Sequence, residues 1–383
     1  SDCVGYDTSA CSNPNVVFVP EGPFMMGCNE ALDGDCGCRP ETDYNCVDPD
    51  INDEASYHQV HVSDFVIDKY EITVDAYGEC QAANDGDTCA WMKDSSWNGI
   101  PGTPAYDSAD FETYRNVRRD SGVIKAKADR GNHPINFLAY ERAKDFCHYN
   151  NKRLPTEAEW EKAARGTDGR VFPWGEGMPT CQRAWVYDWF NPSCVDADGN
   201  IDESECDLVD PNEMGNGFGC GQAKTTEVNA FAEYTSPYGA LNMVGNVSEW
   251  VLDCYSQTFY NFHENMSVNP LNDPTSDSCT HGVLRGGSFS DKTRNLRTSF
   301  RRNHPLTTTE FKPYKGFGAR CAQKITEVEV ANDPNDYLVG NSVCESEFHL
   351  SNGVPENTAI DNVIREHIGS TTGASDDWGD ENT

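Results

Sequence analysis

The sequence predicts an α+β fold with little regular secondary structure, held together by disulfides. Three observations support this prediction. The 383 residues include 32 Gly and 20 Pro, which is typical of a loop-rich chain. There are 17 Cys, and short segments with strand or helix patterns are separated by Gly-, Asp- and Asn-rich loops. A chain of this length can bury one large core or two modest ones.

The cysteines indicate an oxidising compartment, because disulfides persist there and can join loops that lack a core of their own. The count is odd, so at least one cysteine is free, modified or bonded to another molecule. The chain starts at Ser1 and has no apolar run long enough to span a bilayer. We therefore expect an exported protein whose signal peptide has been removed, either secreted or periplasmic and associated with the cell surface.

The formal net charge of −34 argues against nucleic acid as a partner, since an acidic surface repels phosphate. Carboxylates spaced through loops suit divalent cations or a saline exterior. The simpler interpretation is a solvated acidic surface that keeps the protein soluble.

The first half of the chain has strand patterns followed by a helix. Residues 16–27 read as two short strands around a Pro-Glu-Gly turn, and residues 58–73 alternate like a half-buried strand. A helix is expected to begin at Val74, and Cys80 and Cys89 are expected to close the loop after it.

Two further helices are predicted in the middle of the chain. Residues 136–150 carry apolar side chains at helical spacing. The second helix follows Thr156, which is expected to be its N-cap, with Glu159 three residues on to complete a capping box. Carboxylates in that first turn favour a helix N-terminus without any catalytic role.

Two acidic insertions interrupt these elements, at residues 28–53 and 181–222. The second is bounded by Cys181 and Cys220. It contains oxygen ligands on alternate residues around a glycine, the pattern that Ca²⁺ requires, at Asp196, Asp198, Asn200 and Asp202. The alternative is an acidic solvent loop joined by Cys194 and Cys206.

Three motifs carry a family resemblance: Leu-Pro-Thr-Glu-Ala-Glu-Trp-Glu at 154–161, Gly-Asn-Val-Ser-Glu-Trp at 245–250 and Arg-Gly-Gly-Ser at 285–288. They resemble the formylglycine-generating-enzyme or sulfatase-modifying-factor family, which implies a C-type-lectin-like variant fold. The resemblance covers residues 16–321. It leaves an N-terminal disulfide loop at 1–15 and a C-terminal extension at 322–383.

In enzymes of that family, two cysteines after Arg-Gly-Gly-Ser hold Cu(I) and use O₂ to oxidise a substrate cysteine. Soft thiolates are what Cu(I) requires. Here residues 290–302 contain no cysteine, and the resemblance aligns Arg294 and Ser299 with the two thiol positions. We therefore expect no copper and no catalytic residues.

The resemblance implies two structural features. Cys147 and Cys321 match a family disulfide. Gly245, Asn246, Val247 and Glu249 match a family calcium site built from side-chain and carbonyl oxygens. In the alternative interpretation of the second feature, Glu249 only satisfies backbone N–H groups in a turn.

Arginines are concentrated downstream of Arg-Gly-Gly-Ser, at Arg294, Arg297, Arg301 and Arg302. Family proteins without the thiols often use this region for binding. The arginines could clamp a carboxylate or an acidic tail of a neighbouring molecule. The alternative is local pairing with Asp and Glu.

The leading hypothesis is a non-catalytic, exported, calcium-stabilised scaffold or binding protein, with the C-terminal extension docking on a protein partner or a second copy. One alternative is a sulfatase-maturation-type oxidase with a displaced active site. Another is a glycan-binding C-type-lectin-like module, although the Glu-Pro-Asn and Gln-Pro-Asp tripeptides of sugar-binding C-type lectins are absent.

Overall fold

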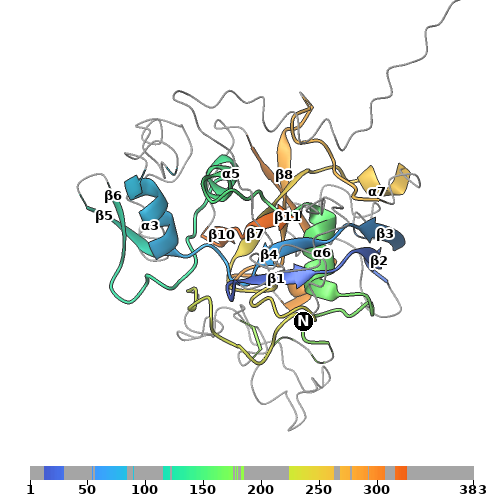
Figure 1. The fold of residues 1–383 in the computed structure, drawn as a ribbon, viewed down its shortest axis with the longest axis horizontal. Coiled ribbons are helices and arrows are strands. Elements are labelled where there is room, and N and C mark those ends of the chain that lie inside the picture. Colours follow the sequence, from blue (N-terminus) through green and yellow to red (C-terminus); the bar gives the residue numbers. More distant parts are fainter. Residues whose placement is uncertain are drawn as a thin grey trace, which may run out of the picture. The chain divides into compact units, whose positions relative to one another are not determined.

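The structure is a computed structural model. It describes residues 13–29, 54, 57–83, 89, 115–120, 123–175, 177, 179, 183–184, 224–262, 268–276, 278–291, 293–306 and 315–325. Two compact units divide the chain, Ser1–Ser342 and Val343–Thr383, and all described residues belong to the first. Short strands, few helices and many loops make up the described part (Figure 1).

A three-stranded antiparallel sheet brings the two ends of the described chain together. Its order is β1 (Val16–Val19), β4 (Phe65–Asp68) and β11 (Ala322–Lys324). Strand β11 lies beyond residue 321, so the fold continues past the boundary expected from the sequence.

The two strands expected around the Pro-Glu-Gly turn are present, but they do not pair with each other. Strand β2 (Gly22–Met26) pairs instead with β3 (His58–Val62), while β1 pairs with β4. The segment 58–73, which reads as one alternating strand, is divided into β3 and β4.

A four-stranded sheet contains the end of the Gly-Asn-Val-Ser-Glu-Trp motif and the first residue of Arg-Gly-Gly-Ser. Its order is β10 (Phe317–Gly318), β7 (Ser248–Cys254), β8 (His281–Arg285) and β9 (Arg301–Pro305). Strand β10 runs parallel to β7, and the other neighbours are antiparallel. A separate hairpin consists of β5 (Val117–Asp120) and β6 (Val123–Ala126).

The helices are short. They are α3 (Val74–Ala83), α5 (Tyr140–Tyr149), α6 (Glu157–Arg165) and α7 (Phe259–Phe262), with a 3₁₀ turn, η3 (Thr293–Leu296). The predicted capping box of α6 is present: the Thr156 side chain accepts from the Glu159 N–H, and the Glu159 carboxylate accepts from the Thr156 N–H. All nine residues of α6 are buried, and the helix contacts β2, β3, β7 and β8 (Figure 1).

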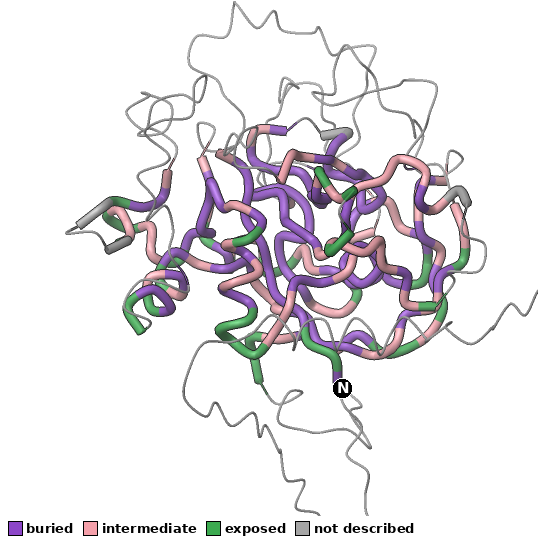
Figure 2. Tube along the Cα trace, turned by 90° about the horizontal axis from the view of Figure 1, so that it is seen from above, coloured by how far each residue is buried: buried purple, intermediate pink, exposed green. Residues whose placement is uncertain are grey.

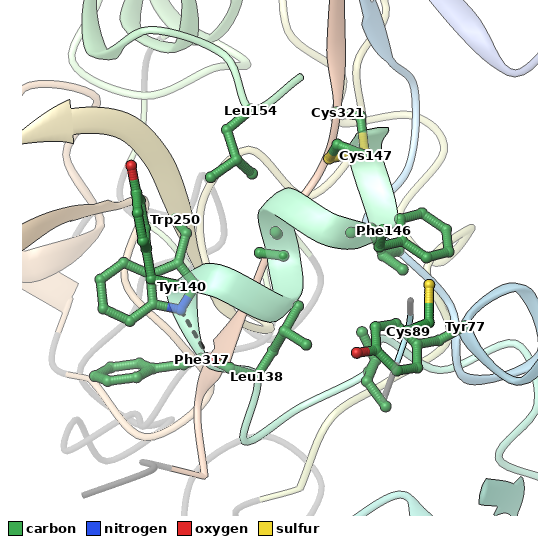
Figure 3. Packing of buried hydrophobic residues seen from close by; sticks show 14 of the residues in the cluster. Tyr77, Cys89, Leu138, Tyr140, Phe146, Cys147, Leu154, Trp250, Phe317 and Cys321 are labelled. Atoms are coloured by element: carbon green, nitrogen blue, oxygen red, sulfur yellow. Dashed lines mark hydrogen bonds between the residues drawn. A yellow bond between two sulfur atoms is a disulfide. The ribbon is translucent and has the colours of Figure 1, made fainter. Parts of the chain in front are cut away.

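Buried residues are concentrated in the centre of the described region (Figure 2). One cluster surrounds Trp250, whose ring packs edge-on against Tyr140 and Phe317 and whose Nε1 donates to the Leu138 carbonyl at 2.8 Å (Figure 3). A second cluster contains Trp160 and the apolar faces of β1 to β4.

Three disulfides join described cysteines. Cys147–Cys321 links α5 to the segment before β11, with Cα atoms 5.5 Å apart (Figure 3). Cys80–Cys89 closes the chain after α3, and Cys254–Cys279, a pair not anticipated from the sequence, connects the end of β7 to the approach to β8. None of the helices in the described ranges has the length and apolarity to cross a membrane.

The capping box yields a test of how α6 is anchored. Replacing Thr156 by Ala should lower the free energy of unfolding by about 1 kcal/mol, because the Glu159 N–H loses its acceptor at a buried helix N-terminus. Thr156→Ser keeps a hydroxyl and is the matched control. Urea denaturation of both variants measures the difference, and equal stability of the two would contradict this role of the cap.

Candidate functional site

The segment after β8 begins with a turn that requires glycine. Gly286 and Gly287 have φ angles of +85° and +66°. A Cβ at Gly286 would lie 2.6 Å from the Met243 carbonyl oxygen and 3.0 Å from the Trp160 ring. The turn therefore packs directly against α6 and the Gly-Asn-Val-Ser-Glu-Trp motif, and the chain leaves it toward η3 and β9.

Ser299, one of the two residues aligned with the copper thiols, lies in a buried ion-paired cluster. Its hydroxyl donates to Glu54 at 3.3 Å, and Glu54 forms an ion pair of 2.9 Å with Arg297. Arg297 also lies 3.1 Å from the sulfur of Cys28, and the Cys28 N–H donates to the Glu54 carbonyl. Cys28 is itself disulfide-bonded. The hydroxyl, carboxylate and guanidinium groups at this position do not fit Cu(I), which selects thiolates.

The remaining arginines of this region are also held within the chain. The Arg301 guanidinium binds Glu157 with two nitrogens at 2.6 and 2.9 Å and lies over the rings of Tyr255 and Tyr260. Arg302 pairs with Asp291. Local pairing, the alternative left open by the sequence, therefore describes Arg297, Arg301 and Arg302, whereas the side chain of Arg294 lies outside the described residues.

Arg285 connects this region to α6. It is fully buried and donates to Glu157 at 3.2 Å and to Glu161 at 2.6 Å, as well as to the carbonyls of Thr298 and Ser299. The two arginines keep the pKa of Glu157 below its usual value even though burial acts in the opposite direction. Glu157 thus remains charged, and the carboxylates of Glu157 and Glu161 both act as structural anchors for Arg285.

Glu249, expected to be a calcium ligand, faces a cation of the chain. Arg320 donates to both of its carboxylate oxygens at 2.7 Å, and Trp160 Nε1 donates to one of them at 2.8 Å. The other three expected ligands lie in the turn before β7, where Gly245 and Asn246 have positive φ angles and Val247 belongs to the core. The Asn246 side chain is directed to a different carboxylate, that of Glu71.

Glu71 forms the centre of a buried acidic pocket that sequence reasoning missed. The side-chain amides of Asn242 and Asn246 donate to its Oε2 at 2.9 and 3.2 Å. Its Oε1 is buried without a hydrogen-bond partner in the described part of the chain. Burial raises the pKa of Glu71 to about 8; Arg320 opposes this shift, whereas Glu249 adds to it. No local pattern could have identified the pocket, since Glu71 and Asn242 are 171 residues apart in sequence.

The other predicted site residues fall into two groups. Cys147, Cys321, Cys80 and Cys89 form the disulfides described above. Outside the described residues lie Asp196, Asp198, Asn200, Asp202, Cys181 and Cys220. Within the described ranges, no group of three or more His, Cys, Asp or Glu side chains lies close enough together to hold a metal ion.

Comparison with known proteins identifies the family. Residues 4–325 match the model of the sulfatase-modifying factor enzyme 1-like domain, and the chain belongs to this family. It is 30% identical over 287 residues to a formylglycine-generating enzyme of Thermomonospora curvata, covering 72% of this chain and 82% of that enzyme.

Two further similarities differ in coverage. The uncharacterized protein YfmG of Bacillus subtilis is 24% identical across 86% of this chain, which spans 58% of YfmG. Among solved structures, PvdO from Pseudomonas aeruginosa is 20% identical, with a TM-score of 0.49 and coverage of 84% of this chain and 99% of PvdO.

The Glu71 pocket predicts a pH dependence of stability. A carboxyl that keeps its proton to about pH 8 when folded, but loses it near 4.5 when unfolded, makes the folded state bind more protons between these values. The free energy of unfolding should therefore fall as the pH rises, by at most about 1.4 kcal/mol per pH unit for one proton. Burial also raises the pKa of Asp253 to about 7. Below pH 7, Asp253 therefore adds to the decrease in the free energy of unfolding with rising pH.

Denaturation midpoints of chelator-treated protein between pH 6 and 9 measure the slope. Glu71→Gln should flatten it between pH 7 and 8, above the pKa of Asp253 and up to that of Glu71. Above pH 8, Lys162, whose pKa burial lowers to about 8, contributes a slope of the opposite sign. An unchanged slope in the variant would show that Glu71 titrates normally.

The Glu54–Arg297 pair predicts a strong asymmetry between single and double variants. Arg297→Met leaves the buried Glu54 carboxylate without this ion pair and should cost about 3–5 kcal/mol. Adding Glu54→Gln removes the uncompensated charge and should recover part of that loss. Urea denaturation measures the free energy of unfolding of both variants. A double variant as unstable as Arg297→Met alone would contradict a stabilising ion pair between Glu54 and Arg297.

Proposed function

We propose that this protein is a non-catalytic, calcium-stabilised scaffold or binding protein, exported and acting at a cell surface or within an extracellular assembly. Its framework would be an α+β, C-type-lectin-like form of the family fold. The observation that carries the proposal is the cluster around Ser299. Where the resemblance places a copper thiol, the chain has a buried hydroxyl bonded to the Glu54–Arg297 ion pair.

Chemistry at this position would need two thiolates and access for a substrate. Ser299 is 1% exposed and Arg297 is 4% exposed. Opening the cluster would separate a buried carboxylate from its guanidinium, which is costly. Both facts support a structural role for the segment from Ser290 to Arg302.

The pocket at Glu71 supports calcium as the stabilising ion. The Glu71 Oε1 is buried without a hydrogen-bond partner in the described part of the chain. Binding of a proton or a cation at such an oxygen would lower the free energy of the buried carboxylate. The carboxylate oxygens of Glu71 belong to the hard donor class that Ca²⁺ prefers, and the side-chain amides of Asn242 and Asn246 hold the carboxylate in place by donating to Oε2. When bound, the ion would supply charge neutralisation at the junction of the segment after β4 and the turn before β7.

The calcium proposal is tested with elemental analysis and thermal unfolding of the full chain. Calcium should co-purify with the protein. At about 100 times the dissociation constant it should stabilise the folded state by about 2.7 kcal/mol relative to chelator. The shift should disappear in Glu71→Gln and persist in Glu227→Gln, an exposed carboxylate that serves as the matched control.

Each contrary outcome has a definite meaning. Absence of both bound calcium and a thermal shift would refute calcium stabilisation. If calcium still raises the unfolding temperature of Glu71→Gln, the ion binds at another site, such as the segment containing Asp196 and Asp202.

The partner of such a scaffold is proposed to be a protein or a second copy of the chain, engaged through the C-terminal extension 322–383. The described strand β11 shows that residues 322–324 belong to the domain itself. A truncation for testing should therefore begin after residue 325. If the extension mediates assembly, its removal should lower the mass in solution; an unchanged mass would count against that role.

A further inference from the structure

The three disulfides between described cysteines differ in their access to solvent. Cys80, Cys89, Cys147 and Cys321 are each 0% exposed. In the third pair Cys254 is 7% exposed, and Cys279 is partly exposed between the exposed residues Ser278 and Thr280. Because a thiolate must reach a sulfur along the S–S axis, exposure decides which disulfide exchanges first.

The strands around this disulfide are held by backbone bonds that do not depend on it. Cys254 pairs with Gly282 in the β7–β8 ladder, and the Tyr255 N–H donates to the His281 carbonyl at 2.8 Å. On the other side, the Leu306 N–H donates to the Thr280 carbonyl at 2.9 Å. Breaking the S–S bond therefore leaves both cysteines close to their present positions.

The surroundings also favour the reduced form of the pair. The His281 carbonyl oxygen lies 3.4 Å from the Cys254 sulfur and 3.8 Å from the Cys279 sulfur. A disulfide sulfur carries no hydrogen to donate, whereas a thiol at either position would find this acceptor in place. The geometry thus offers the dithiol a hydrogen bond that the disulfide cannot make.

We propose that the Cys254–Cys279 disulfide is a thiol–disulfide exchange site that accepts an external thiol at Cys279. The incoming thiolate forms a new S–S bond with the Cys279 sulfur while the Cys254–Cys279 bond breaks. The electron pair passes to the Cys254 sulfur, which takes a proton from water and, as a thiol, donates a hydrogen bond to the His281 carbonyl oxygen. With a dithiol reagent, the second thiol then attacks the mixed disulfide and releases Cys279 as a thiol, so the reagent is oxidised.

The direction of attack follows from burial. Cys254 is nearly enclosed, and its backbone is held from a second side: its N–H donates to the Asn272 carbonyl, and the Asn272 side-chain amide donates to the Cys254 carbonyl. Cys279 is thus the accessible sulfur and Cys254 the leaving group. Small thiols of the glutathione type would remain attached to Cys279, and dithiols would carry the reduction to completion.

The test is a brief exposure of the full-length protein to dithiothreitol under native conditions, followed by alkylation and peptide mass mapping. Cys254 and Cys279 should be alkylated about tenfold faster, or more, than the Cys80–Cys89 and Cys147–Cys321 pairs, which act as internal controls. With glutathione in place of dithiothreitol, the adduct should be found on Cys279.

Either of two results would overturn the proposal. One is alkylation of the buried pairs at the same rate as Cys254 and Cys279, and the other is a glutathione adduct on Cys254. Circular dichroism of the briefly reduced protein checks that the fold persists, and loss of the fold on reduction of this pair would also contradict local exchange. The double variant Cys254→Ser, Cys279→Ser gives an independent check where it folds, because its adduct should be absent.

Discussion

The buried carboxylates of α6 are the constraint on which the described fold depends. All nine residues of this helix are buried, and a buried carboxylate is costly unless a cationic side chain pairs with it. Glu157 and Glu161 therefore require arginine partners inside the protein. Arg285, from the end of β8, binds both, and Arg301, from the start of β9, binds Glu157. The helix is thereby fixed to two strands far away in sequence, and removal of Arg285 would take an ion-pair partner from both carboxylates at once.

The same kind of pairing holds the segment after Arg-Gly-Gly-Ser within the described part of the chain. Arg297, Arg301 and Arg302 form ion pairs within the protein. Their partners are Glu54, Glu157 and Asp291, respectively. A net charge of −34 makes such pairing easy, because carboxylates greatly outnumber cations. Within the described ranges Glu71 forms no ion pair, since Arg320, the nearby cation, is bound by both oxygens of Glu249.

Sequence alone was sufficient for the features encoded by local pattern. The α6 cap could be predicted because Thr156 and Glu159 are three residues apart, and the family follows from three contiguous motifs. Strand pairing was not predictable to the same degree: β1 and β2 flank a turn that reads as a hairpin, yet each pairs with a strand whose partner residues lie between 32 and 52 positions further along the chain. The Glu71 pocket and the Glu54–Arg297 pair join residues separated by 171 and 243 positions, so no spacing rule could reveal them.

The region aligned with the copper thiols is a buried, ion-paired cluster around Ser299. An anaerobic Cu(I) competition titration of the disulfide-intact protein against a chromogenic chelator tests most directly whether this cluster binds copper. We expect the protein to bind no Cu(I) through residues 290–302 and Ser299→Ala to leave the titration unchanged. One tightly held equivalent of Cu(I) that is lost in Ser299→Ala would contradict it.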